Sequence, residues 1–493
     1  MKPGFTRGAG VLMAISSLPS PFGIGTLGDA AFAFADFLKA AGQRYWQVLP
    51  VGVTGYGDSP YQSPSAFAGN PLFIDPARLM AAGLLTEEEV DAAREPVDAV
   101  DYDRLVLTRP PLLRRAFARF RPDEDYHTFC REQAYWLTDY ALFAALKVRF
   151  DGRDLHDWDA DIRERRPEAV ARYTAELADE IAFANFCQYE FFAQWRALKD
   201  YVNAAGIRLI GDMPIYVSGD SADVWAHGEQ FQLNAEGYPT AVAGVPPDAF
   251  CAEGQRWGNP LYDWDAMAED GFSWWRQRME HSAALFDAVR IDHFIGIARY
   301  YAIPASCETA IEGEWRQGPG RLLTNVLDEV AARTGTAILA EDLGVLHRQV
   351  KTLLRQTGYP GMSVLMFGFD GNPKNPHLPH NYPRNRTVYG GTHDNDTIVG
   401  YCATAPRREI GNMMRYFGVK RRAAIPLAML RAAYASVADL AIFQMQDLLG
   451  LPGTARMNTP STVGGNWRWR MQPDAADDEL AERLREFARM YDR

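Results

Sequence analysis

The chain has 493 residues, which is enough for one large elaborated domain or two or three smaller ones, and enough to bury a sizeable core. Its 47% hydrophobic and 23% charged residues are typical of a soluble globular protein. The formal net charge of -12 argues against a general nucleic-acid binder, because affinity for phosphate depends on an excess of Lys and Arg. An uncharged or cationic substrate fits this charge better.

Cysteine usage and hydropathy together predict a location in the cytoplasm. The five cysteines are odd in number and show no C-x-x-C spacing, which is typical of reduced thiols in a cytosolic protein. Residues 1–7 lack the apolar segment and cleavage site of a signal peptide. No run approaches the roughly 20 apolar residues needed to cross a bilayer. We therefore expect a cytoplasmic protein with no membrane partner.

The first elements along the chain form a strand–helix–strand unit. Residues 10–15 and 45–51 are apolar strand candidates, and residues 29–41 between them have the spacing of an amphipathic helix that ends at Gly42. This order implies a parallel sheet with a right-handed crossover. The following loop, 54–71, is rich in Gly, Pro, Ser and aromatic residues, and such loops seldom serve packing alone.

Two long segments interrupt the alternation of strands and helices. Residues 76–202 have the pattern of long amphipathic helices, so we expect a largely helical insertion whose aromatic residues mainly pack a core. A strand near residue 208 then resumes the sheet and ends at Asp212. Residues 215–279 follow as a second insertion, a long irregular stretch of the kind that usually forms a lid or substrate-binding loop.

Eight strand candidates alternate with helical stretches such as 322–333 and 347–355. They are centred near residues 11, 46, 208, 289, 338, 364, 388 and 441. This alternation makes a (β/α)8 barrel the economical fold. Because no repeat or linker separates independent domains, we expect one elaborated catalytic barrel over residues 1–493 that carries the two insertions.

Three of these strands end in an acidic residue. The strand at 288–291 leads to Asp292, the strand at 336–340 leads to Glu341, and the strand ending at residue 391 leads to Asp394. As the fourth, fifth and seventh strands of a barrel, they would all present these acids at the C-terminal mouth, where barrel enzymes carry their chemistry. We therefore expect the three carboxyl groups to converge.

Converging carboxyl groups without an obvious metal-binding constellation suit the chemistry of glycosidic bonds. That chemistry needs one ionised carboxylate and one protonated carboxylic acid on either side of the bond. Arg290 points to the same side of its strand as Asp292 and should keep that acid ionised. Glu341, near other carboxylates in a partly dry pocket, should have a raised pKa and hold a proton to donate. Asp394 could then brace the sugar hydroxyls and the oxocarbenium-like charge.

Each of these residues also has a structural interpretation. Arg290 and Asp292 alone would more often be a structural ion pair, and Glu341 with Asp342 alone would more often begin a helix. Only the joint placement at three strand ends favours catalysis. The residues themselves leave open a plain α-glucan hydrolase and a non-catalytic glycan-binding protein.

Eight motifs, spread over nearly the whole chain in the same order, resemble those of the 4-α-glucanotransferases, also called amylomaltases or disproportionating enzymes, a branch of the α-amylase superfamily. They are Ser59-Pro60-Tyr61-Gln62, Gly211-Asp212-Met213-Pro214-Ile215-Tyr216-Val217, Gly244-Val245-Pro246-Pro247-Asp248, Gly254-Gln255-Arg256-Trp257-Gly258-Asn259-Pro260, Arg290-Ile291-Asp292-His293-Phe294, Ala340-Glu341-Asp342-Leu343-Gly344, Gly391-Thr392-His393-Asp394-Asn395 and Arg456-Met457-Asn458-Thr459-Pro460.

The resemblance implies a role for each matching residue. Asp292 would be the nucleophile that forms a covalent glucosyl-enzyme, Glu341 the general acid and base, and Asp394 the stabiliser of the transition state. The residues expected around the attacked glucose are Arg290, His293 and His393. Those expected to contact neighbouring sugar units are Tyr61, Asp248, Gln255, Trp257 and Asn466.

The resemblance also implies the partners of the chain. Its substrates would be α-1,4-glucans, which include maltooligosaccharides, glycogen or starch, together with glucose. The fold would be a barrel with inserted subdomains and no C-terminal β-domain. No cofactor and no metal would be needed, and transfer to a sugar would be favoured over hydrolysis.

Overall fold

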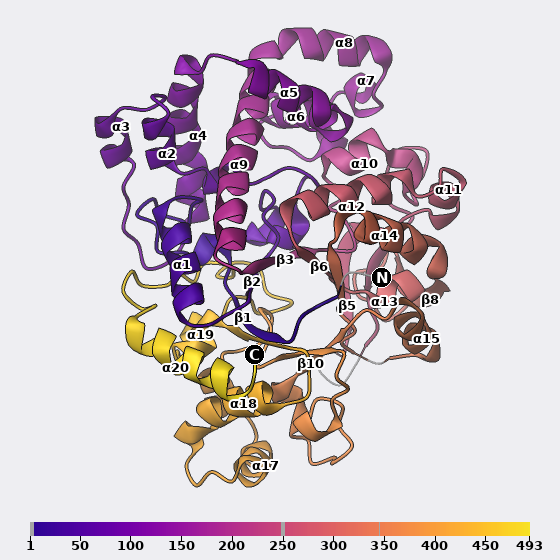
Figure 1. Cartoon of the computed structure of the whole chain (residues 1–493). Helices are drawn as coiled ribbons and strands as arrows, with labels where there is room; N and C mark the ends of the chain where they lie inside the picture. The colour runs from indigo at the N-terminus through magenta and orange to yellow at the C-terminus, as the bar shows by residue number, and fades with distance from the viewer. Residues whose placement is uncertain (1–3, 248–251, 345) are drawn as a thin grey trace.

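A computed structural model describes residues 4–247, 252–344 and 346–493 (Figure 1). All eight predicted strands are present and join in one parallel sheet in the order β10-β11-β12-β1-β2-β3-β6-β9. The two edge strands meet where the Ala340 N–H donates to the Pro360 carbonyl at 3.0 Å. The sheet is therefore a nearly closed barrel, and the predicted (β/α)8 fold class is confirmed. Its strands are β1 (Gly8–Leu12), β2 (Tyr45–Gln47), β3 (Arg208–Met213), β6 (Ala288–Ile291), β9 (Ala337–Ala340), β10 (Gly361–Val364), β11 (Arg386–Tyr389) and β12 (Leu440–Gln444).

Helices surround the barrel and connect its strands (Figure 1). The first helix of the chain packs against the last, and strand β1 pairs with β12, so the two terminal regions lie together. No helix in the described part of the chain is long and apolar enough to span a bilayer. The helices next to the barrel are α1 (Asp29–Ala40), α12 (Ser273–Leu285), α13 (Ile295–Ala298), α14 (Arg321–Thr334), α15 (Arg348–Thr357), α16 (Ile398–Thr404), α17 (Arg407–Phe417), α18 (Ile425–Ala435), α19 (Met445–Leu448) and α20 (Asp478–Met490).

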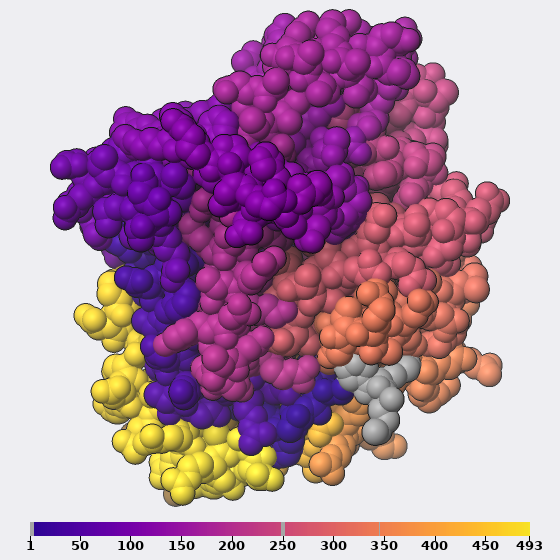
Figure 2. Space-filling view, turned by 45° about the horizontal axis from the view of Figure 1, so that its top comes forward, coloured from indigo at the N-terminus to yellow at the C-terminus, as the bar shows by residue number. Residues whose placement is uncertain are grey.

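Eight helices follow one another over residues 76–204, between β2 and β3, and their purple atoms form the top of the molecule in the space-filling view (Figure 2). The longest of them also belongs to the barrel wall, because the buried Trp195 ring donates through Nε1 to the Leu285 carbonyl at 3.1 Å. One helix thus joins the helical body to the barrel. The helices are α2 (Pro76–Ala81), α3 (Glu87–Ala92), α4 (Tyr102–Arg119), α5 (Glu124–Glu132), α6 (Ala134–Arg149), α7 (Ala160–Arg163), α8 (Pro167–Glu176) and α9 (Ala178–Ala204).

The expectation of an irregular stretch at 215–279 is wrong. This stretch holds α10 (Ala222–Ala226), β4 (Ala241–Val245), β5 (Gln255–Pro260), α11 (Trp264–Glu269) and the first half of α12. Its strands join β7 (Arg299–Pro304) and β8 (Glu314–Gln317) in a second, antiparallel sheet in the order β5-β4-β7-β8. Strand β4 pairs with β7 although the barrel strand β6 lies between them in the sequence. Local periodicity in the sequence does not indicate such a pairing.

The strand predicted at 362–369 is shorter than expected. Strand β10 ends at Val364, and residues 365–368 continue as a 3-10 turn. Leu365 and Met366 in that turn are still buried. An apolar run alone does not distinguish a buried strand from a buried turn, so its length was overestimated.

Candidate active site

Strand register brings two of the predicted acids side by side. In the barrel Ile291 of β6 pairs with Ala340 of β9, so Asp292 and Glu341 both stand one residue beyond a paired position. The Glu341 N–H donates to the Ile291 carbonyl at 3.0 Å, which extends the ladder to the acids themselves. Asp394 follows β11, two strands further around the sheet. All three acids therefore stand at the C-terminal edge of the barrel.

A buried ion network sets the environment of Asp292. Arg290 donates through Nη1 to both carboxylate oxygens of Asp212, at 2.6 and 2.8 Å, and the same nitrogen lies 2.8 Å from Oδ1 of Asp292. The Asp212 side chain is 0% exposed and that of Arg290 is 4% exposed. Burial alone would lower the pKa of the Arg290 guanidinium, but the carboxylates of Asp212 and Asp292 raise it well above its ordinary value. Arg290 thus remains a cation between two acids.

Close packing on the opposite face of β3 depends on a glycine. A β-carbon on Gly211, next to Asp212 in β3, would lie 2.2 Å from the Phe286 ring. Because consecutive strand residues face opposite sides of the sheet, only glycine lets that ring pack against the face of β3 that points away from the ion network.

Glu341 is held in a different chemical state. Its carboxyl accepts from the His293 N–H at 2.8 Å and from the Leu343 N–H at 2.7 Å, and the residue is 7% exposed. Burial raises the pKa of this carboxyl to about 8, Arg290 opposes the rise, and the Asp292 carboxylate adds to it. At neutral pH the group carries a proton, as the sequence predicted for Glu341.

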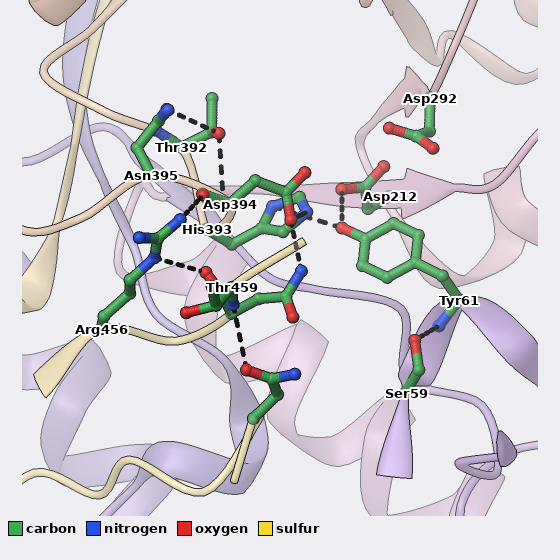
Figure 3. A network of polar contacts seen from close by, with 12 residues as sticks. Ser59, Tyr61, Asp212, Asp292, Thr392, His393, Asp394, Asn395, Arg456 and Thr459 are labelled. Carbon is green, nitrogen blue, oxygen red and sulfur yellow. Dashed lines mark hydrogen bonds and ion pairs between the residues drawn. The ribbon is translucent and has the colours of Figure 1, made fainter. Parts of the chain in front are cut away.

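An aromatic pair joins the ion network to the third acid (Figure 3). The Tyr61 hydroxyl donates to Asp212 Oδ2 at 2.9 Å and lies 3.3 Å from Nδ1 of His393. The Tyr61 and His393 rings stack with centroids 5.0 Å apart. Burial and the Asp212 charge raise the pKa of Tyr61 well above its ordinary value, so its single proton stays on the oxygen. Because that proton is donated to Asp212, the Tyr61 oxygen accepts a hydrogen bond from Nδ1 of His393.

Asp394 lies on the more open side of the site. Its side chain is 46% exposed, and Oδ1 lies 3.4 Å from Nε2 of His393. Asn458 donates through Nδ2 to the same Oδ1 at 2.7 Å, and Arg456 donates to the Asp394 backbone carbonyl at 2.6 Å. The amide that contacts this carboxylate is neutral. No Arg or Lys side chain in the described part of the chain contacts it.

His293, the residue after Asp292, has a buried imidazole ring close enough to Asp292 to feel its charge. Its backbone φ of 49° lies in the left-handed region, which is uncommon for a residue other than glycine, and the Trp257 ring packs edge-on against it at 4.8 Å. Burial lowers the pKa of the imidazole to about 4, although the Asp292 charge opposes this. Its Nε2 is buried and has no hydrogen-bond partner among the described residues. A neutral ring with a free nitrogen can bind a hydroxyl group.

A cavity of about 480 Å³ adjoins these groups. It is lined by Gln255 and Trp257 of β5 on one wall and by Asn458 and Asn466 on another. Gln255 accepts from the Trp257 indole at 3.1 Å. The lining offers amides and ring faces, and in the described ranges no three His, Cys, Asp or Glu residues are grouped to hold a metal ion.

The predicted sugar contacts differ in how available they are. Tyr61 and Trp257 expose parts of their rings beside the acids, whereas the Asn466 amide is bound within its own loop, where it accepts from Thr459 N–H at 3.0 Å and donates to Thr462 at 3.1 Å. Asp248 lies outside the described residues.

Two contributors were not assigned a role from the sequence. The sequence shows Asp212 only as an acid beyond an apolar run, yet in the structure it is the principal partner of Arg290. Its position at the end of a strand, like that of the other acids, was the available signal. Asn458, which bonds Asp394, lies in a loop motif that carried no such signal.

Comparisons with known proteins agree over nearly the full length. A model of the family described as 4-alpha-glucanotransferase matches residues 13–476. The 4-alpha-glucanotransferase of Thermus thermophilus is 47% identical over 500 residues, which cover 99% of each chain. That of Clostridium butyricum is 42% identical over 487 residues, which cover 98% of this chain and 100% of the relative. Amylomaltase from Streptococcus agalactiae, solved in complex with acarbose, superposes with a TM-score of 0.95 at 40% identity over 99% of both chains.

Proposed function

The chain belongs to the 4-alpha-glucanotransferase family, and from this premise we propose that it transfers α-1,4-glucan segments to the 4-hydroxyl of another glucan or of glucose through a covalent glycosyl-Asp292 intermediate. One observation carries the proposal. Asp292 and Glu341 are register neighbours, Asp292 is paired with a buried cation, and Glu341 has a pKa raised to about 8. A charged nucleophile beside a protonated acid is what glycosidic-bond cleavage with retention needs.

The first half-reaction cleaves the donor glucan. Glu341 gives its proton to the glycosidic oxygen while an Asp292 oxygen attacks the anomeric carbon. The bond between that carbon and the leaving oxygen breaks, and the reducing-end fragment departs with a new 4-hydroxyl. Asp394, whose carboxylate contacts no Arg or Lys side chain among the described residues, stabilises the positive charge that develops on the sugar ring.

The second half-reaction uses the same pair in reverse. The ester at Asp292 is uncharged, so one of the influences that raise the pKa of Glu341 is gone, and the Glu341 carboxylate can act as a base. It takes the proton from an acceptor 4-hydroxyl, whose oxygen attacks the anomeric carbon and releases Asp292. Two inversions restore the original configuration. Retention requires the two carboxyl groups to lie about 5–5.5 Å apart.

The cavity beside the acids supports a sugar, in place of water, as the acceptor. Tyr and Trp faces bind sugar rings by stacking; Trp257 lines the cavity, and Tyr61 stacks on His393 beside Asp394. An acceptor held in line has an advantage of effective concentration over solvent. The acarbose complex of the Streptococcus agalactiae relative supports α-glucans as the substrate class of this chain. The described cysteines are free thiols, which supports a cytoplasmic location.

Incubation with maltotriose tests the function. Transfer produces glucose together with oligosaccharides longer than the substrate, and chromatography separates these products. Hydrolysis, the competing reaction, produces only shorter sugars. A product mixture without longer chains would contradict the proposed transfer, and the absence of any product would favour a glycan-binding protein.

A further inference from the structure

The segment 457–467 forms a closed loop over the cavity. Its ends are joined, because the Trp467 N–H donates to the Met457 carbonyl at 2.7 Å. Residues 459–465 are all exposed and supply much of the cavity lining, whereas Met457, Asn466 and Trp467 are buried. We name this segment the 457–467 loop. The loop has two parts. Its tip faces solvent and can contact a glucan, and its base is rigid.

One end of the base bonds the third acid. Asn458 donates to Asp394 Oδ1 at 2.7 Å through its side chain and to the His393 carbonyl at 3.1 Å through its backbone. Arg456 spans the same junction, since it donates to the Asp394 carbonyl at 2.6 Å and to the Asn458 carbonyl at 2.7 Å. These bonds fix the direction of the Asn458 amide relative to Asp394. Figure 3 shows the bond from Arg456 to Asp394.

The other end of the base supports the aromatic pair. The Trp467 ring lies 5.7 Å from that of Tyr61 and 5.9 Å from that of His393. Trp467 adopts a φ of 64°, a strained value for a residue other than glycine, and the Tyr102 hydroxyl donates to its carbonyl at 3.2 Å. The surrounding bonds maintain this strain, so the base is held in one arrangement.

We propose that Asn458 is a positioning residue that aims the Asp394 carboxylate at the transition state. The Asp394 side chain is 46% exposed, so it has room to rotate, and no Arg or Lys side chain among the described residues restrains it. The amide of Asn458 holds Oδ1 and leaves Oδ2 directed at the bound sugar. Because the amide is neutral, it fixes the carboxylate without cancelling the charge that stabilises the oxocarbenium-like ring. This inference rests on the proposed transfer reaction.

The Asn458→Ala variant tests the positioning directly. A hydrogen bond to a charged group that matters mainly in the transition state should appear in kcat, which we expect to fall ~10- to 100-fold on maltotriose. KM should change less than ~3-fold. An unchanged kcat, or a rise in KM alone, would overturn the proposal, since the latter would mean that Asn458 binds ground-state sugar.

The Asn458→Asp variant keeps the shape of the side chain and tests the contact independently, through the pH dependence of kcat/KM. It places two carboxyl groups in contact beside His393, and they cannot both ionise, so one proton is retained to higher pH. The acidic limb of the kcat/KM profile should therefore move up by about 1 pH unit or more. An unmoved limb would mean that residue 458 does not contact the catalytic Asp394 carboxylate in the working enzyme, and it would overturn the proposal even if the alanine variant failed to fold.

Controls separate this inference from the proposed function. Asn325→Ala removes an exposed asparagine on α14, outside the 457–467 loop and the acids, and should leave both kcat and the pH profile unchanged. If the wild type makes no longer sugars from maltotriose, the proposed function fails. If it does, and both Asn458 variants match the wild type, only the role of Asn458 is refuted.

Discussion

The two sides of the site hold their acids by different means. On the side of β3 and β6, Asp292 shares the Arg290 guanidinium with a fully buried Asp212. On the side of β11, the half-exposed Asp394 is bonded by the neutral Asn458 amide and approached by His393. The first arrangement comes from adjacent barrel strands, and the second depends on a loop more than sixty positions further along the chain.

This difference matches two chemical tasks. A nucleophile has to remain charged and aligned before substrate arrives, and a buried cation on a rigid strand supplies both conditions. A group that stabilises positive charge has to keep its own charge uncompensated, and an amide allows that. We therefore expect substitutions that change the charge near Asp292, on the strand side, to be poorly tolerated. Substitutions near Asp394, on the loop side, should lower mainly kcat.

The largest effect should come from removing the nucleophile. Asp292→Asn keeps the size of the side chain but cannot form the glycosyl ester, so kcat should fall by ~10⁴-fold or more. Asp394→Asn should cost less, ~10²- to 10³-fold, because it weakens stabilisation without removing the covalent step. Initial rates on maltotriose, with the exposed Asp200→Asn as control, would measure both. Equal activity of Asp292→Asn and wild type would refute the assignment.

The buried ion network should dominate stability on the strand side. Asp212→Asn leaves the buried Arg290 with one acid fewer, and breaking a buried pair in this way costs ~3–5 kcal/mol of unfolding free energy. Urea denaturation would measure the loss. Glu124→Gln, which breaks the exposed pair between Glu124 and Arg131, should leave the midpoint essentially unchanged. Similar midpoints for the two variants would show that burial adds nothing here.

The protonation of Glu341 should limit activity at alkaline pH. Its pKa is raised to about 8, so kcat/KM should fall roughly tenfold per pH unit above that value. The same shift predicts a cost in stability, because the folded protein loses stability as pH rises from the ordinary pKa of a glutamate toward 8. Glu341→Gln should remove that pH dependence of the unfolding free energy while abolishing transfer. A basic limb near pH 5 would contradict this account.

The smallest effect should come from the link between the two sides. Tyr61→Phe removes the hydroxyl that donates to Asp212, but Arg290 still pairs that acid, so the loss should be about 1 kcal/mol, or roughly fivefold in kcat/KM. Tyr201→Phe is a matched control, because its hydroxyl also donates to an aspartate, Asp36, at 2.8 Å on the surface. A loss above a hundredfold for Tyr61→Phe would mean that the hydroxyl acts on substrate itself.

Much of the barrel was predictable because its strands are short apolar runs that stop at ionisable groups. The predicted positions of all eight strands match the sheet, including the three that lead to Asp292, Glu341 and Asp394. The antiparallel sheet was not predictable, since β4 pairs with β7 across an intervening barrel strand. The same holds for Asp212, whose partner Arg290 lies on the neighbouring strand, and for the Asn466 amide, which is bound within its own loop.

The sequence by itself determined the alternation of strands and helices and the placement of three acids at strand ends, because periodicity and chain order are local properties. Tertiary structure alone decided which further groups meet: Asp212 joins the Arg290 guanidinium, and the Asn458 amide bonds Asp394. It also decided that burial is the main cause of the raised pKa of Glu341. These depend on strand register, desolvation and loop closure, which arise only when residues distant in the chain are brought into contact.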